Sequence, residues 1–519
     1  SKRVITLANN AGKAFFSKCQ IVDVMNVSDL TIALDQIVTD GAPALERKRA
    51  RLAALCRTYI QNYGDGDASL LRAPARINVL GEHIDYVSYL PTASLTFGSR
   101  ERDALFLYGK STLPLVRGSS TSPGYDSASF PVFEGRTPQF GVDVAAEWLA
   151  FLAEYGTPGP HWQNYIQGAV VFARGKYGQE IAHGFDFAVD SNIPAGGGAS
   201  SSSALVVLGG AAVRYVNDIP FTPEQLARDS ALAEWFIGTR GGSMDHTTIC
   251  LAQPSTAVLI NYVTHETRRI GIPDTTFEWI TFFSQPANKG HEVMLEYNER
   301  AAVSRLIIPG IISNWRESNP DLYNSWQNFL MEVSSGNTEA IQRGELLMES
   351  LPESISIESL RTNYPELFLE FQQSFTALLN ATDRWPLPVR TRAQHHLGEV
   401  RRVALAAHAL SSIQNQSSPE ARLDVMRTLG KLMDQSHASL RDLYGVSTDE
   451  VEQLIQTIRS ETNVLGARLM GGGFGGSVLA LATAENVQSL IDRVQAGFYT
   501  PLGRDGVDEG AVMVSTPGD

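Results

Sequence analysis

The chain has 519 residues, of which 43% are hydrophobic and 19% charged, and its formal net charge at pH 7 is −14. This acidic excess disfavours nucleic acid and anionic membranes as partners, because both carry negative charge themselves. The sequence contains no apolar run of the roughly 20 residues that a membrane-spanning helix needs, and the first residues lack the apolar core of a signal peptide. We therefore expect a cytoplasmic protein, long enough for two or three domains.

The first half of the chain combines a helical segment with alternating strands and helices. A helical pattern spans Leu45 to Tyr63, so we expect residues 1–68 to form an N-terminal helical extension. From residue 69 to residue 283, helical patterns alternate with short β-prone runs, which predicts a mixed α/β lobe. The runs that indicate strands are Leu105–Tyr108, Phe185–Val189 and Ala257–Tyr262.

The remaining residues, 284–519, are expected to form a second lobe. Between about residues 303 and 385 the sequence is rich in helical patterns, which proline and serine residues divide into separate helices. Two of the expected helices are Tyr323–Ser334 and Ile341–Glu349. The sequence thus predicts an α+β fold of two lobes with mixed β-sheets, an N-terminal extension and a helical insertion.

A cluster of polar side chains follows the first predicted strand of the larger lobe. An apolar alternation through Ile77 and Val79 reaches Gly81, and the chain then becomes polar. The side chains that follow include Glu82, His83, Asp85 and Tyr86. Several donors and acceptors close together suit a ligand with many hydroxyl groups, although a solvated surface turn has a similar composition.

A run of small residues, SNIPAGGGASSSSAL at residues 191–205, leads into a helix-compatible apolar stretch. A helix N-terminus has unpaired N–H groups and partial positive charge, so this run is a candidate phosphate site for ATP. A flexible Gly/Ser linker is the alternative. The candidate ATP-binding residues are Gly196, Gly197, Gly198, Ser200, Ser201, Ser202 and Ser203.

A second glycine-rich run, at residues 471–476, precedes another predicted strand. Its glycines permit either a tight turn or a close approach to a ligand.

Two other patterns argue against a Walker A phosphate loop and against cysteine-based sites. Gly109-Lys110-Ser111 matches only the end of a Walker A loop, because Ala104 replaces the leading glycine. The three cysteines form no CxxC pair, so neither a disulfide framework nor a structural zinc site is expected; they are Cys19, Cys56 and Cys250.

Taken together and in this order, the three polar or glycine-rich motifs resemble those of the GHMP kinases, and most closely those of the galactokinase branch. Further similar segments are Gly242–His246, Glu296–Arg300, Arg392–Arg402 and Ser436–Tyr444. The resemblance extends from about residue 70 to about residue 485, apart from the helical insertion. It implies a two-lobe GHMP kinase fold with ATP between the lobes. It also implies phosphoryl transfer from ATP to the anomeric hydroxyl of galactose or a galactose-like sugar.

The resemblance also assigns roles to individual residues. Asp245 is implied as the general base and Arg76 as its partner, which stabilises charge near the transferred phosphoryl group. A neighbouring guanidinium lowers a carboxylate's pKa, so we expect Asp245 to be ionised but weakly basic. Mg²⁺ is implied with Glu234 and a loop serine as ligands, and the register on Gly198 favours Ser202. The implied sugar-binding residues are Glu82, His83, Asp85, Tyr86, Gly242, Tyr297 and Gly472.

Three departures from the galactokinase pattern leave the sugar open. Ala75 replaces a glycine, and the segment Val87–Tyr89 is short, so that Tyr89 can fill or narrow the pocket. Arg240 stands where proline is usual and can either bind the carboxylate of a uronic acid or pair with a surface Asp. Galactose is the leading substrate, with galacturonate, N-acetylgalactosamine and arabinose as alternatives. A catalytically silent ATP- and sugar-binding regulator is the alternative of another class. The sequence does not indicate an oligomeric state.

Overall fold

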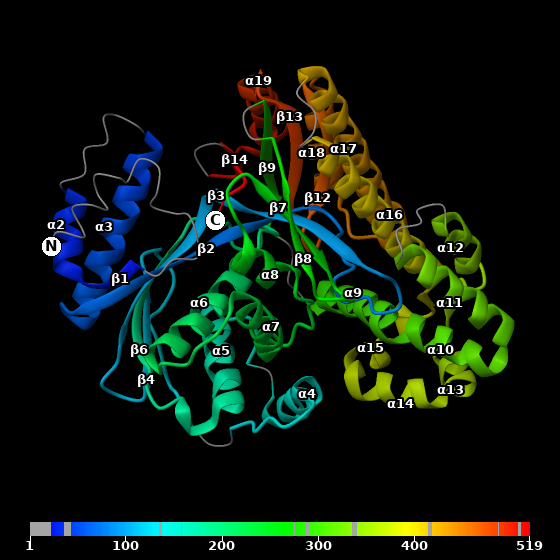
Figure 1. Ribbon diagram of the computed structural model, residues 1–519, viewed down its shortest axis with the longest axis horizontal. Coiled ribbons are helices and arrows are strands. Elements are labelled where there is room, and N and C mark those ends of the chain that lie inside the picture. The colour runs from blue at the N-terminus through cyan, green and yellow to red at the C-terminus, as the bar shows by residue number, and fades with distance from the viewer. Residues whose placement is uncertain are drawn as a thin grey trace.

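The computed structural model describes residues 22–35, 43–133, 137–156, 158–273, 276–286, 291–334, 340–413, 418–485, 487–506 and 510–518. Two large β-sheets, each covered by helices, form two lobes, and a helical region extends from the second (Figure 1). The predicted α+β architecture with a helical insertion is confirmed. Within the described residues, no helix has both the length and the apolar character that crossing a membrane requires.

The first lobe contains an eight-stranded sheet in which β1, β2, β3, β6, β4 and β5 are successive neighbours and β7 joins β3 to β8. All but one pair of neighbouring strands are antiparallel, the exception being β4 and β6. The strands are β1 (Val22–Asn26), β2 (Asp67–Leu80), β3 (Ala93–Lys110), β4 (Leu115–Ser120), β5 (Ala128–Pro131), β6 (Phe185–Ser191), β7 (Thr256–Asn261) and β8 (Thr267–Gly271). Two of the predicted strands lie within β3 and β6, and the third lies within β7 except for Tyr262, which follows its end.

Both faces of this sheet are covered by helices. Side chains alternate along a strand, so Leu105 of β3 packs toward the N-terminal helices whereas Phe106 faces the main core. The N-terminal pair is α2 (Val27–Asp35) and α3 (Pro43–Tyr63), the latter close to the predicted helix. The helices that follow β5 are α4 (Val144–Tyr155), α5 (Trp162–Tyr177), α6 (Ser201–Val216), α7 (Pro223–Ala233) and α8 (Met244–Leu251). Cys56 and Cys250 are buried, and Cys19 lies outside the described residues.

The second lobe contains a four-stranded antiparallel sheet in the order β12, β13, β9, β14. Its strands are β9 (Phe277–Gln285), β12 (Val464–Met470), β13 (Gly476–Thr483) and β14 (Val512–Ser515). We expected the lobes to divide at residue 283, but β9 pairs with β13 and so belongs to the second sheet. In the second sheet β9 lies between β13 and β14 and forms hydrogen bonds with both. The chain therefore crosses from the first sheet to the second after β8.

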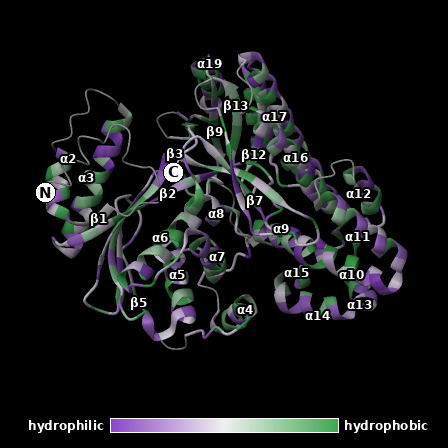
Figure 2. Cartoon of the chain, viewed as in Figure 1, coloured by the Kyte–Doolittle hydropathy of each residue, from purple (hydrophilic) through white to green (hydrophobic). Residues whose placement is uncertain are grey.

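The helices of the second lobe fall into two groups. Helices α17 (Pro419–Ser439) and α18 (Asp449–Arg459) pack on its sheet, and α19 (Val487–Val494) packs on α18. The long helix α16 (Arg390–Ile413) instead packs on α17 and on β3 and β8 of the first lobe. The helix α9 (His291–Ala302) leads into the insertion, which comprises α10 (Ile308–Ser318), α11 (Pro320–Ser334), α12 (Ala340–Met348), α13 (Ile357–Asn363), α14 (Pro365–Ser374) and α15 (Thr376–Asn380). The short strand β10 (Ser354–Ile355) lies within the insertion, and its partner β11 (Leu387–Pro388) follows directly after it. These helices carry hydrophobic and hydrophilic stripes (Figure 2), as expected for amphipathic helices around a core.

Candidate active site

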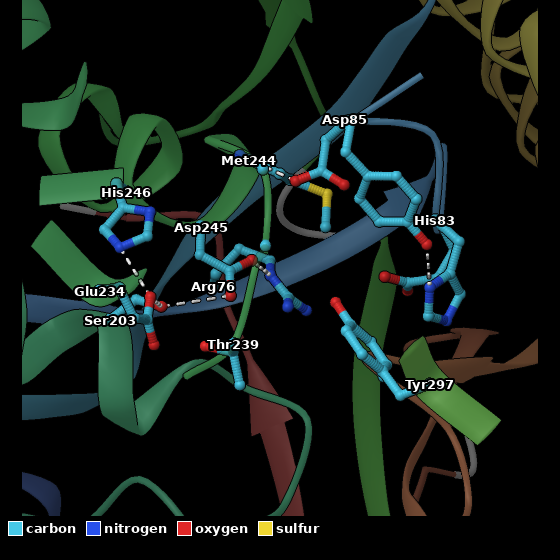
Figure 3. A pocket seen from close by; sticks show the side chains of 15 residues that line it. Arg76, His83, Asp85, Ser203, Glu234, Thr239, Met244, Asp245, His246 and Tyr297 are labelled. Carbon is cyan, nitrogen blue, oxygen red and sulfur yellow. Dashed lines mark hydrogen bonds and ion pairs between the residues drawn. The ribbon is translucent and has the colours of Figure 1, made fainter. Parts of the chain in front are cut away.

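A cavity collects most of the residues that the sequence predicted for the site (Figure 3). The predicted residues that line it are Arg76, Glu82, His83, Asp85, Tyr86, Ser203, Glu234, Gly242, Asp245, Tyr297 and Gly472. The other loop residues named for ATP do not line this cavity; they are Gly196, Gly197, Gly198, Ser200, Ser201 and Ser202. The cavity is also lined by residues to which the sequence motifs assigned no role, namely Thr239, Gly241, Met244 and His246.

Arg76 and Asp245 form an ion pair in this cavity. Arg76 lies near the end of β2 and Asp245 in the first turn of α8, and Arg76 Nε is 2.7 Å from Asp245 Oδ1. Arg76 Nη1 also donates to the carbonyl oxygen of Gly198, 2.9 Å away. Burial opposes ionisation of Asp245, but the Arg76 guanidinium outweighs it and holds the pKa of this carboxyl below its usual value. Asp245 is therefore ionised at neutral pH.

Glu234 lies where α7 ends, and two side chains contact its carboxylate. Ser203 Oγ donates to Glu234 Oε2 at 2.8 Å, and His246 Nε2 lies 2.8 Å from the same oxygen. Ser203 Oγ is also 3.4 Å from Asp245 Oδ2, so one hydroxyl connects both carboxylates. Ser202, which the sequence favoured as the metal ligand, is half-buried and lies outside the cavity lining. The structure thus brings Ser203, rather than Ser202, to Glu234.

The Gly/Ser run forms a turn into α6 whose N-terminus has open backbone donors. Ser200, the residue before the helix, has φ +64° and its side chain makes no capping bond to the first turn. The glycine runs of the two lobes meet here: a Cβ on Gly198 would lie 2.5 Å from the carbonyl oxygen of Met470, and one on Gly471 would lie 2.6 Å from Gly198 Cα. Uncapped N–H groups at a helix N-terminus attract anions, so this turn suits phosphate.

The polar turn after β2 forms the opposite side of the cavity and is held from the second lobe. Glu82 Oε2 accepts from Arg468 Nη2 at 2.8 Å and from the backbone N–H of Gly471 at 2.9 Å. Gly242 lies against Asp85, because a Cβ at position 242 would be 2.2 Å from Asp85 Oδ2. A side chain larger than hydrogen at this position would displace Asp85, which explains the glycine.

Burial shifts the ionisation of two sugar-side candidates in opposite directions. It raises the pKa of Asp85 to about 6, and the nearby negative charge of Asp245 adds to the rise. Burial lowers the pKa of His83 to about 4, so this imidazole is neutral at pH 7. The sugar side of the cavity therefore combines a readily protonated carboxyl, a neutral imidazole and the hydroxyls of Tyr86 and Tyr297, all suited to binding hydroxyl groups.

Two residues singled out as specificity determinants lie away from the cavity. Tyr89 is buried among residues of the insertion, and its hydroxyl contacts His396, so it neither fills nor narrows the pocket. Arg240 lies over the ring of Trp235 and donates to that residue's carbonyl oxygen. Neither expectation for Arg240 is met: it does not line the cavity, and within the described residues it has no carboxylate partner.

Several residues that fix the site were not predicted from the sequence motifs. Arg468 could have been recognised from its place just before the glycine run, and His246 from its position beside Asp245. Arg305 had no such signal, because it lies in the insertion; its Nη2 donates to the carbonyl oxygen of Gly241, and its guanidinium stacks on Tyr86. This contact supports the cavity wall through Gly241.

Comparison with known families matches three segments of the chain. Residues 164–253 match the GHMP kinases N terminal domain and residues 419–500 match the GHMP kinases C terminal domain. Residues 57–93, which include the polar turn after β2, match the galactokinase galactose-binding signature. The chain therefore carries both GHMP kinase domains together with the galactokinase galactose-binding signature.

Relatives and a solved structure agree with this GHMP kinase assignment. The chain is 26% identical to a galactokinase of Dictyostelium discoideum, with 88% of this chain and 89% of the relative covered. It is 28% identical to a galactokinase of Homo sapiens, with 88% and 95% covered. The crystal structure of Lactococcus lactis galactokinase complexed with galactose has 21% identity and a TM-score of 0.62, covering 89% of this chain and 97% of that one. This last similarity shows the shared fold.

Proposed function

We propose that this GHMP kinase is an ATP-dependent sugar 1-kinase, which transfers the γ-phosphoryl group to the anomeric hydroxyl of galactose or a close galactose-like sugar. The observation that carries the proposal is the ion pair of Arg76 and Asp245. It lies in one cavity with Ser203 and Glu234 on one side and the polar turn after β2 on the other. Phosphoryl transfer needs positioning and charge stabilisation more than covalent chemistry, and this arrangement offers both.

In the proposed reaction the anomeric oxygen of the sugar forms a bond to the γ-phosphorus while the bond to the ADP oxygen breaks. Asp245 accepts the hydroxyl proton or orients the hydroxyl for attack. Its depressed pKa makes it a weak base, so orientation and electrostatics carry much of its effect. Arg76 offsets the negative charge on the transferred group. The open N–H groups at the start of α6 hold the ATP phosphates.

Mg²⁺ is the proposed metal, and the side chains around Glu234 fit it. Mg²⁺ prefers oxygen ligands and usually takes only one or two carboxylates besides phosphate and water. The Glu234 carboxylate and a serine hydroxyl are such ligands, and Ser203 is the serine that the structure places within 2.8 Å of Glu234. A bound Mg²⁺ would supply charge neutralisation at the ATP phosphates. The use of ATP also agrees with the cytoplasmic location expected from the sequence. This location stays a prediction.

Galactose remains the leading substrate. The galactose-binding signature at residues 57–93 and the galactokinase relatives support it. The hypothesis of a uronic acid substrate relied on Arg240, which lies outside the cavity lining. N-acetylgalactosamine and arabinose remain alternatives, since both share hydroxyl groups with galactose.

The experiment that tests this function is an ADP-release assay with ATP and Mg²⁺ against galactose, N-acetylgalactosamine, galacturonate, arabinose, glucose and mannose. Asp245→Asn keeps the shape of the side chain and removes its charge, so galactose turnover should fall by orders of magnitude while sugar binding persists. Asp492→Asn, at an exposed position of α19, is the matched control and should behave as wild type. Absence of turnover with every sugar, despite calorimetric binding of ATP and galactose, would favour the regulator.

A further inference from the structure

A chain of hydrogen bonds connects the insertion to the sugar side of the cavity. It begins at Tyr89, whose hydroxyl is 2.6 Å from His396 Nδ1. The other ring nitrogen, His396 Nε2, is 3.0 Å from Ser304 Oγ. Ser304 Oγ is in turn 3.2 Å from the hydroxyl of Tyr444. Tyr89, His396, Ser304 and Tyr444 are all buried, so water does not replace these contacts.

The chain then reaches two residues that line the cavity. The Tyr444 hydroxyl is 2.9 Å from the Tyr86 hydroxyl, which is 3.1 Å from His83 Nδ1. The second ring nitrogen, His83 Nε2, is buried and has no hydrogen-bond partner in the described part of the chain. Figure 3 shows His83 at the cavity wall, with a dashed line that ends at its ring. Six side chains therefore form one continuous path from the insertion core to the cavity.

The partners determine the direction in which the hydrogen bonds run. Among the described residues, the Tyr89 hydroxyl contacts only His396, so its proton must go to Nδ1, because a buried hydroxyl without an acceptor is costly. A neutral His396 then carries its proton on Nε2 and donates to Ser304. Burial lowers the pKa of His396 well below its usual value, which keeps the ring neutral.

Toward the cavity the hydrogen bonds run in the same direction. Ser304 donates its hydroxyl proton to the Tyr444 hydroxyl, and Tyr444 donates to the Tyr86 hydroxyl, so that Tyr86 donates to His83 Nδ1. With Nδ1 as an acceptor, a neutral His83 carries its proton on Nε2. The opposite direction would leave the Tyr89 proton without an acceptor. The cavity wall at His83 is thus an N–H donor rather than a bare lone pair.

We propose that Tyr89, His396 and Ser304 are positioning residues that hold Tyr86 in place and fix His83 as its Nε2–H tautomer, and so set the affinity for the sugar. This inference rests on the proposed sugar kinase function and deepens it. The three residues touch no part of the cavity and act through Tyr444 and Tyr86. Two π-helical turns, Val303–Ile307 and Leu440–Tyr444, carry Ser304 and Tyr444 into the path. Such turns are frequent at functional sites.

Tyr89→Phe tests the proposal because it removes the hydroxyl at the start of the path and keeps the ring. Without this hydroxyl the hydrogen bonds from His396 to His83 can run in either direction, so His83 is no longer held as one tautomer. We expect the KM for galactose to rise about five- to tenfold, which is the factor for one lost hydrogen bond. The KM for ATP and kcat should stay within about twofold. Tyr63→Phe is the matched control, because the Tyr63 hydroxyl bonds to Ser119 far from the cavity; it should leave all three constants unchanged.

A double-mutant cycle and a spectroscopic measurement complete the test. Ser304→Ala interrupts the same path, so Tyr89→Phe combined with Ser304→Ala should raise the KM no further than either change alone. In ¹⁵N-histidine NMR spectra, wild-type His83, assigned by its loss in His83→Asn, should show a protonated Nε2, and the variants should show a mixture of tautomers.

Three results would overturn the proposal. These are an unchanged sugar KM in Tyr89→Phe, a parallel rise of the sugar and ATP KM values, and a wild-type His83 protonated on Nδ1. If the wild-type protein phosphorylates no sugar, the proposed function fails instead, while the NMR measurement still decides whether the path fixes the tautomer.

Discussion

Within the cavity, single side chains perform tasks that their residue types alone do not reveal. Asp245 and Asp85 are both carboxylates of one cavity, yet Arg76 lowers the pKa of the first, whereas burial raises that of the second to about 6. At neutral pH Asp245 is therefore fully ionised, whereas Asp85 is mostly ionised but takes up its proton within about one pH unit of neutrality. The two carboxylates thus differ in how readily they can donate a hydrogen bond.

The contact of Ser203 with Glu234 leads to a test of the metal ligand. Ser203→Ala should raise the Mg²⁺ concentration for half-maximal activity about tenfold and lower kcat, because the hydroxyl that joins Glu234 to Asp245 is lost. Ser202→Ala is the control and should change this concentration less than twofold. The measurement is a titration of ADP release with Mg²⁺ at saturating ATP. A larger effect from Ser202→Ala would restore the serine that the sequence favoured.

The raised pKa of Asp85 predicts a pH-dependent stability. Its pKa is about 6 in the folded protein and 3.8 ordinarily, so the folded state binds this proton more tightly. The proton on Asp85 therefore stabilises the folded state below about pH 4, and this stabilisation is lost as the pH rises through 6. Asp85→Asn stays neutral and should raise the free energy of unfolding by about 1–3 kcal/mol at pH 8, and by less at pH 5. Thermal unfolding at both pH values measures this; equal effects would contradict the assignment.

The start of α6 and the two glycine runs act as one unit of structure. Gly198 has φ +70°, and its backbone touches Met470 and Gly471 of the second lobe. Arg76 donates to the Gly198 carbonyl oxygen, so the same contact joins the ion pair of Arg76 and Asp245 to the turn before α6. The glycines are needed because two backbones meet where a side chain would not fit.

Gly198→Ala tests this contact. The new Cβ would lie 2.5 Å from the Met470 carbonyl oxygen, in a backbone conformation that alanine disfavours. We expect a loss of about 2–4 kcal/mol in stability and at least a tenfold rise in the KM for ATP. Gly503→Ala is the matched control, because Gly503 has φ +68° and open space around it. It should lose only about 1–2 kcal/mol of stability, from backbone strain, and its KM for ATP should be unchanged. Equal effects of both changes would remove Gly198 from the phosphate site.

For the whole molecule, the insertion is part of the sugar site's support. Its core includes Trp326 and Phe329, and it also buries Ile84 and Leu90 from the segment around the polar turn. Leu397 and Val400 of α16 join the same cluster. The insertion therefore packs behind the sugar side of the cavity, and any change in its core reaches the polar turn through direct contact.

Trp326→Ala should show this coupling. Trp326 is 1% exposed and its ring lies 6.2 Å from that of Tyr89. Its truncation should cost about 3–5 kcal/mol and raise the sugar KM several-fold in the protein that remains folded. Phe172→Ala, at a buried position of α5 with 1% exposure, is the control, with a similar cost and no change in sugar KM. Denaturant unfolding and steady-state kinetics give the two quantities. A normal sugar KM in Trp326→Ala would show that the insertion is independent of the site.

Features that depend on local chemistry could be predicted from the sequence. Glycine runs before a helix or a strand, a polar turn after a strand and the order of these motifs predicted the family, the two lobes and most cavity residues. The amphipathic patterns likewise predicted α3, α11 and α12 closely. These features could be read because backbone freedom, hydrogen-bonding groups and apolar periodicity are properties of neighbouring residues.

Which distant residues meet depends instead on the three-dimensional packing of the elements. It assigned β9 to the second sheet, brought Ser203 rather than Ser202 to Glu234, and buried Tyr89 against His396. One helical step of about 100° separates adjacent serines, so the rotation of α6 in its packing chose between them. Tyr89 and His396 are 307 positions apart, and their contact arises from packing around the insertion core. No local pattern carries that information, since it depends on how separate elements fit together.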